Sequence, residues 1–183
     1  MERRIFFKAA VLCLAMIAGC ISLTACSNDD DEPEVTNDLT TIKTAFSVSL
    51  SEDWYMFFDI EVKYVSETGE QTVTLTQDWS FDAEIPYSAA PDMFAFYVTA
   101  KPKADTPAIE AGVTYVLEES IHASVSGILK DGTQDARYGS QGERIGREEK
   151  SGKGMEKYIQ GEHSLFSFSV SYTHLTLPTK ALV

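Results

Sequence analysis

The chain has only three cysteines, and all of them lie near its beginning, at Cys13, Cys20 and Cys26. A domain that starts after Cys26 therefore has no disulfide bonds to hold it together. Its stability has to come from a hydrophobic core. The stretch from about Thr40 to Phe168 is long enough to bury such a core within one domain.

Basic residues are also scarce, with 15 Lys and Arg against 28 Asp and Glu. Removing residues 1–25 takes away three bases and one acid, which leaves 12 bases, 27 acids and a net charge of −15. Nucleic-acid binding depends on a basic face, so this balance argues against a nucleic-acid partner. A strongly acidic chain is typical of a soluble surface protein.

Motifs for catalysis or metal binding are missing as well. No serine lies in a nucleophile-elbow pattern. Glu118 and His122 would share one face of a strand but lie too far apart to chelate one metal, and His163 has no visible partner. Four acids offer candidate carboxylate pairs but are more typical of a solvated sheet face: Asp59, Glu61, Asp78 and Asp82. We expect no enzyme activity, no cofactor and no metal site.

Residues 1–25 have the layout of a secretory signal peptide, with a basic start, an apolar run and small residues before a cleavage point. The apolar run is short for a transmembrane helix, which needs about 20 residues. It ends in LTAC (residues 23–26), which resembles the bacterial lipobox. That resemblance implies that Cys26 carries the lipid and becomes the new N-terminus. Cys20 closes a second match, but cleavage there would leave a hydrophobic stub.

Residues 26–40 begin with the acidic sequence CSNDDDEPE and contain few apolar residues. Such a segment cannot bury enough surface to order itself, so we expect a disordered tether. The acidic run after the lipid cysteine also resembles the export signal of Bacteroidetes surface lipoproteins. It implies an outer-membrane protein, anchored by lipid and facing outward.

The body of the chain alternates apolar and polar residues with period two, as half-buried strands do. Phe58–Tyr64 and Thr72–Thr76 flank a turn in which Gly69 can adopt positive φ, so they predict a hairpin. In a long strand from Val113 to Val125, apolar residues share one face and Glu119 is the exception.

The other predicted strands are Ala45–Leu50, Ser80–Tyr87, Met93–Ala100 and Leu165–Ser169. Phe166 and Phe168 should face inward. About seven short strands with turns between them predict a β-sandwich over residues 41–169, with a lipocalin-like barrel as the alternative. The stretches DIEVKYVSETGEQTVTLT and YVLEESIHASVS resemble small Ig-like lipoproteins of gut Bacteroidetes, which implies an antiparallel Ig-like sandwich.

Residues 131–161 break this pattern, since they hold seven of the chain's 11 glycines and half of the bases that follow residue 25. We predict a long, disordered, glycine-rich loop there, with a short helix near Met155–Gln160 before the last strand.

Aromatic residues are the candidates for ligand binding, because their rings can stack on sugars. Trp54 and Trp79 follow aspartates at predicted strand edges, where we expect exposure, and Tyr87 lies at the end of a strand. Tyr97 fits the core better, since aromatic residues dominate sandwich interiors. We expect a non-catalytic binding or structural module, and a glycan or a partner lipoprotein as its ligand.

The last residues, 170–183, resemble a translated transposase-type sequencing adapter, whose bases encode VSYTHLTLPT without a mismatch. We therefore expect no function for Tyr172 or His174. The gene sequence beyond Ser169 tests this assignment.

Overall fold

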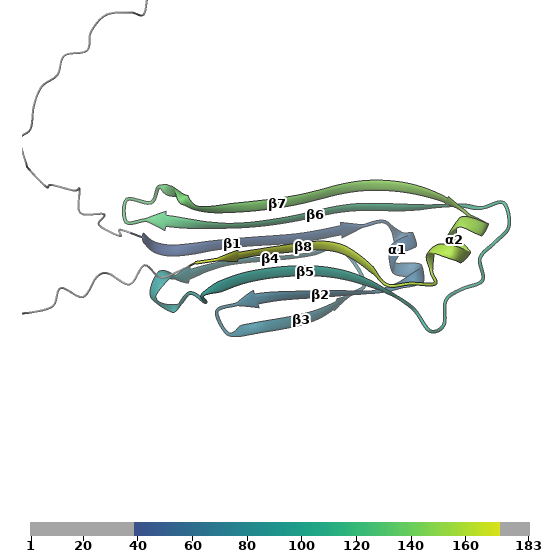
Figure 1. Ribbon diagram of the computed structural model, residues 1–183, viewed down its shortest axis with the longest axis horizontal. Helices are drawn as coiled ribbons and strands as arrows, with labels where there is room; N and C mark the ends of the chain where they lie inside the picture. Colours follow the sequence, from purple (N-terminus) through teal and green to yellow (C-terminus); the bar gives the residue numbers. More distant parts are fainter. Residues whose placement is uncertain (1–38, 173–183) are drawn as a thin grey trace, which may run out of the picture. The chain divides into compact units, whose positions relative to one another are not determined.

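The computed structural model describes residues 39–172, which form two antiparallel sheets of four strands each. The sheets pack face to face as a sandwich (Figure 1). Sheet A has the strand order β4-β1-β6-β7, and sheet B has the order β3-β2-β5-β8. The predicted sandwich is confirmed, and the alternative of a closed barrel is wrong.

Each of the seven predicted strands is present, and an eighth lies where a loop was expected. The elements are β1 (Leu39–Leu50), α1 (Glu52–Phe57), β2 (Phe58–Ser66), β3 (Gly69–Leu75), β4 (Trp79–Pro86), η1 (Tyr87–Ala89), β5 (Met93–Pro102), β6 (Thr114–Leu129), β7 (Gln134–Ser151), α2 (Gly152–Tyr158) and β8 (His163–Ser171). Because β1 begins at Leu39, the last two residues of the predicted tether belong to a strand. The rest of the tether and Cys26 lie outside the described residues.

The predicted hairpin is confirmed as β2 and β3, which pair from Ile60 and Leu75 to Ser66 and Gly69. Gly69 has a φ of 102°, a conformation that side chains with a Cβ rarely adopt. The Ser66 hydroxyl donates to the Gly69 carbonyl oxygen and accepts from the Thr68 amide, which closes the turn.

The alternation predicted for β6 is also confirmed. Tyr115, Leu117, Ile121, Ala123 and Val125 face the core and are at most 7% exposed. They face the inner residues of sheet B. Between the two sheets, Phe46 of β1 stacks on Phe96 of β5, with 4.8 Å between ring centroids. Tyr97, predicted to be in the core, is 38% exposed, because it follows Phe96 and therefore points to the opposite face of β5.

The predicted disordered loop over residues 131–161 is wrong. Residues 134–151 form β7, which pairs with β6 from Ser126 and Gly139 to Thr114 and Ser151. Hydrogen bonds to β6 order this strand without an apolar face of its own. Its glycines allow a close fit, since a Cβ on Gly142 would lie 3.1 Å from the Phe166 ring. The predicted short helix is present as α2, which begins three residues early.

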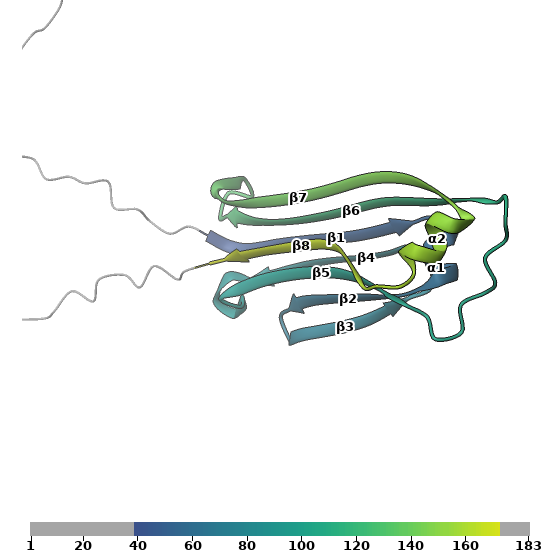
Figure 2. The same ribbon diagram turned by 45° about the vertical axis from the view of Figure 1, so that its right-hand side comes forward.

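Both helices lie at one end of the sandwich, and β1 begins and β8 ends at the other (Figures 1 and 2). Helix α1 follows β1, and α2 precedes β8, so the chain enters and leaves the sandwich at the end opposite the helices. A strand of 12 residues such as β1 spans about 40 Å between these ends.

Strand β8 ends two residues beyond the predicted limit at Ser169. Phe166 and Phe168 face inward as predicted, and the Phe166 ring lies 5.7 Å from that of Phe96. Leu165 is also buried, because the β5–β8 register shifts beside it. Tyr172 is 5% exposed and its hydroxyl donates to the Tyr138 carbonyl oxygen at 2.9 Å. The adapter origin of residues 170–172 stays a prediction, and His174 lies outside the described residues.

Candidate ligand-binding site

Trp54 is buried, which makes its predicted exposure at a strand edge wrong. It lies on α1 and is 2% exposed, packed on Phe58 with 5.2 Å between ring centroids. The helix turns the side chain inward, whereas a strand edge would have left it at the surface. Its ring face therefore cannot serve as a platform on which a sugar stacks.

Hydrogen bonds to β6 explain why α1 carries Trp54 inward. The Ser51 hydroxyl donates to the Val116 carbonyl oxygen at 2.6 Å and accepts from the Glu118 amide at 3.0 Å. The Asp53 carboxylate accepts from the Val116 amide. These contacts hold α1 against sheet A.

Trp79 and Tyr87 do not form one surface with Trp54. Trp79 starts β4 and is half-buried, with its ring 5.3 Å from that of Tyr64. Tyr87 lies in η1, beyond the far end of β4, because β4 runs from Val48 toward Thr41 along β1. Trp79 therefore lies toward the helical end of β1, and Tyr87 lies toward the opposite end. The three predicted ligand-binding residues do not share one surface.

A polar pocket of about 250 Å³ lies beside Trp54 at the helical end of the sandwich. We call it the end pocket. It is lined by Trp54 from α1, Leu117 and Glu119 from β6, Arg144, Ile145, Gly146, Arg147 and Glu148 from β7, and Tyr158 from α2. Side chains from two helices and two strands thus meet at one cavity.

The floor of the end pocket contains a buried carboxylate. Glu119 is 6% exposed and faces inward among apolar neighbours on β6. Arg144 of β7 donates to its Oε1 and forms a salt bridge. Gly146 makes room for this carboxylate, because a Cβ there would lie 2.7 Å from Glu119 Oε1.

Two polar atoms of the lining residues have no hydrogen-bond partner within residues 39–172. One is Trp54 Nε1, which can only donate, and the other is Glu119 Oε2, which accepts when the carboxyl is ionised. Burying such groups without a partner costs free energy, about 1–3 kcal/mol each. An unmatched donor and an unmatched acceptor beside one pocket indicate a place for a polar ligand or water.

Aromatic side chains form the wall on the α2 side. Tyr158 stacks on His163 with 4.0 Å between ring centroids, and its ring lies 6.1 Å from that of Trp54. Lys150 Nζ lies 4.6 Å from the centre of the Tyr158 ring. Burial raises the pKa of Tyr158, and the charges of Glu148 and Glu119 add to this shift. The Tyr158 hydroxyl therefore keeps its proton and remains a donor.

The charges around the pocket are matched by opposite charges. Besides the Glu119 pair, Lys150 forms a salt bridge with Glu148, and Arg147 contacts Glu118 at 3.2 Å. Arg147 also contacts Glu149 at 3.1 Å. The pocket is polar without a clear excess of either charge.

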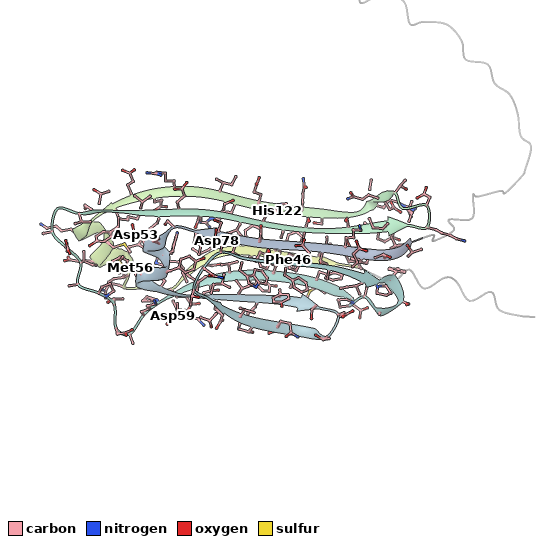
Figure 3. The ribbon with its side chains drawn as sticks, turned by 180° about the vertical axis from the view of Figure 1, so that it is seen from behind. Phe46, Asp53, Met56, Asp59, Asp78 and His122 are labelled. Carbon is pink, nitrogen blue, oxygen red and sulfur yellow. The ribbon has the colours of Figure 1, made fainter. Side chains whose placement is uncertain are left out.

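The four carboxylates considered for catalytic pairs do not form one group. Asp59 and Glu61 lie on β2 in sheet B, whereas Asp82 lies on β4 in sheet A. Figure 3 shows Asp59, on β2, apart from Asp78, which lies in the loop before β4. Glu61 contacts Lys101, and a hydrogen bond from that lysine lowers the pKa of the Glu61 carboxyl.

Asp78 accepts from the Ser49 hydroxyl at 2.8 Å and so has a structural role. Within residues 39–172, no group of three or more His, Cys, Asp and Glu side chains could hold a metal ion. His122 lies on β6, opposite Ser47, and His163 contacts the Tyr158 carbonyl oxygen at 2.9 Å. Helices long and apolar enough to cross a bilayer are also missing from this part of the chain.

Sequence reasoning missed the end pocket as a site, although the sequence contained one clue to it. Glu119 interrupts the apolar face of β6, and a charged residue at an inward position needs a partner. That partner, Arg144, lies 25 residues away in the segment that we predicted to be a loop.

Comparisons with family models, with curated proteins and with solved structures found no match. The function is therefore inferred from the geometry of the chain itself.

Proposed function

We propose that this protein is a lipid-anchored lipoprotein of the bacterial outer membrane, exposed at the cell surface, whose sandwich is a non-catalytic binding module. The lipobox at Cys26 and the acidic residues after it support the location. The finer fold that we propose is an Ig-like sandwich. Connections between the two sheets support it, because β1 pairs with β4 and β6 while β2, β3 and β5 lie in the other sheet.

The observation that carries the binding function is the end pocket and its place in the fold. The chain enters the sandwich at Leu39, and α1 and α2 lie at the opposite end (Figures 1 and 2). The end pocket therefore lies about 40 Å of strand away from Leu39. We expect this end of the sandwich to meet the ligand.

A glycan is the alternative ligand that the sequence suggested. The buried ring of Trp54 cannot stack on a sugar, but the polar atoms of the end pocket can form hydrogen bonds with sugar hydroxyl groups. Trp79 and Tyr87, both partly buried, retain this role only as a prediction.

A partner protein is the second candidate, and exposed apolar side chains favour it. Ile145 on β7 is 72% exposed, and Met56 on α1 is 44% exposed. Both lie on elements that reach the helical end, so a partner lipoprotein could contact this end of the sandwich. Exposed apolar residues indicate a protein interface when they gather into a patch, whereas single ones are normal on a surface.

Calorimetric titration of the full-length protein in detergent micelles tests the binding function. The probes are neutral sugars, amino sugars and sugar acids. We expect at least one probe to bind, and Gly146→Ala to weaken that binding because the new Cβ displaces Glu119. Gly139→Ala is the control on the same strand, where a Cβ meets Gln134 Nε2 at 3.5 Å and the Ala136 carbonyl oxygen at 3.9 Å, both ordinary contacts.

Two results would contradict the proposal. Binding that Gly146→Ala leaves unchanged would exclude the end pocket. Hydrolysis of a probe that persists through repurification would show an enzyme. A third result would replace sugar binding by the partner-protein function. In that case no probe binds, and a cross-linker placed at position 145 on intact cells captures one partner protein.

A further inference from the structure

The polar atoms of the end pocket limit the chemistry of its ligand. Trp54 Nε1 offers a proton, and Glu119 Oε2 accepts one. A hydroxyl group can accept a hydrogen bond from Trp54 Nε1 and donate one to Glu119 Oε2. A carboxylate can only accept, and an ammonium group can only donate. We propose, on the basis of the proposed function, that the end pocket binds a neutral, hydroxyl-rich group the size of one sugar ring.

The charges of the wall support a neutral ligand. Glu119 pairs with Arg144, and Glu148 pairs with Lys150. A ligand with its own charge would either enter without a partner or take one from an existing pair. Both alternatives leave a charge uncompensated beside a buried floor, which is costly.

Burial and volume set the direction of entry and the size of the ligand. The floor is closed, because Trp54 is 2% and Glu119 6% exposed and each unmatched atom exposes less than 1 Å² to solvent. Binding therefore requires these two side chains to shift toward the pocket. The rim is open, since the side chains of Arg144 and Glu148 are 47% and 57% exposed. A volume of about 250 Å³ is below the range of about 300–1,000 Å³ that is typical for drug-sized ligands. The pocket therefore fits a single ring that enters past the rim.

The donor can be removed, and the acceptor can be made neutral, with little change of shape. Glu119→Gln replaces the charged acceptor by an amide, and Trp54→Phe removes the N–H while keeping an aromatic ring. We expect each variant to bind a neutral sugar about tenfold more weakly, the effect of one lost hydrogen bond. Glu84→Gln is the control, because the Glu84 side chain is 67% exposed on sheet A and forms a salt bridge with Lys43, away from the end pocket.

The experiment uses full-length protein in detergent micelles with two sets of probes. The neutral set contains methyl glycosides of glucose, galactose and mannose, and inositol. The charged set contains glucuronate and protonated glucosamine. Binding is measured by calorimetry, and by fluorescence in Trp79→Phe protein, where Trp54 is the one remaining tryptophan. Thermal melting of each variant confirms that it is folded.

Saturable binding of a neutral probe that both variants weaken, with the control unchanged, supports the inference. A charged probe that binds in place of the neutral ones, and is lost on Gly146→Ala, overturns the ligand class but leaves the binding function standing. Ordered water between Trp54 Nε1 and Glu119 Oε2 in a crystal structure, with no probe bound at millimolar concentration, overturns both.

Discussion

At the scale of single residues, Tyr55 has a buried hydroxyl that finds no hydrogen-bond partner in residues 39–172. Burial raises the pKa of Tyr55 to about 12, and the nearby charge of Asp78 adds to the shift. Tyr55→Phe removes the unmatched group. We expect the free energy of unfolding at pH 7 to stay the same or to rise by about 1 kcal/mol in urea denaturation.

The same residue predicts a loss of stability in alkali. The folded pKa of about 12 exceeds the ordinary value of about 10, so the unfolded chain releases this proton at lower pH. Below pH 10 this proton does not change the unfolding free energy, because Tyr55 is protonated in both states. As the pH rises from 10 to 12 the unfolded state loses the proton first, and the unfolding free energy falls. Tyr55→Phe should make the unfolding free energy fall less steeply between these values. An unchanged slope would mean that Tyr55 ionises equally in both states.

Glu119 and Arg144 form the pair whose loss should be most strongly non-additive. Arg144→Leu leaves a buried carboxylate without its partner. Because the Arg144 side chain is 47% exposed, we expect a loss of about 2–3 kcal/mol of unfolding free energy, less than for a fully buried pair. Replacing both residues by leucine should restore stability to within about 1 kcal/mol of the original protein. Urea denaturation of the two single variants and the double variant measures the coupling. Additive losses would show that the pair does not interact in solution.

At the scale of elements, β7 differs most from its prediction. It is an edge strand whose inward positions carry Arg144, Glu148 and Lys150 in place of an apolar row. Inward charges on an edge discourage pairing with a strand from another molecule. They also remove the alternation by which strands are found in a sequence, and the glycines of this strand suggested a loop instead.

Hydrogen exchange tests whether β7 is a strand in solution. In an antiparallel edge strand, every second amide bonds to the neighbour and the others face away. We expect slow and fast exchange to alternate along residues 139–151, with the slow amides donating to β6. Uniformly fast exchange over this range would restore the prediction of a disordered loop.

Gly127 sits where β6 passes β1 and the irregular start of β7. A Cβ at this position would lie 2.5 Å from Leu39 Cδ1 and 2.7 Å from Tyr138 Cβ. Gly127→Ala should therefore lower the unfolding free energy by about 1–3 kcal/mol, the usual cost of overpacking. Gly161→Ala is the control, because no atom lies within 4 Å of the added Cβ, and its effect should stay within about 0.5 kcal/mol. Equal effects would show that the close approach relaxes at no cost.

At the scale of the whole molecule, the lipid anchor decides where the sandwich works. Cys26 closes the lipobox that we prefer, and Cys20 closes the other. We expect Cys26→Ala to lose partitioning into detergent and Cys20→Ala to retain it in phase-separation assays. The reverse pattern would place the lipid on Cys20 and lengthen the segment before the sandwich.

The sequence by itself determined most of the strands and the sandwich. Alternation in Phe58–Tyr64 and on β6 is local, because a pleated strand with one buried face leaves period two in its own residues. Gly69 indicated its turn for a local reason too, because glycine readily adopts the positive φ that the turn requires. The absence of cysteine after Cys26 already required a core without disulfide bonds.

Tertiary structure alone decided the end pocket. Trp54 is buried because α1 is held on β6 by Ser51 and Asp53, and a helix of six residues is too short to show a period. Arg144 meets Glu119 only because β7 pairs with β6 in one particular register. A partner 25 residues away depends on that register, and β7 has no apolar alternation from which the register could be read.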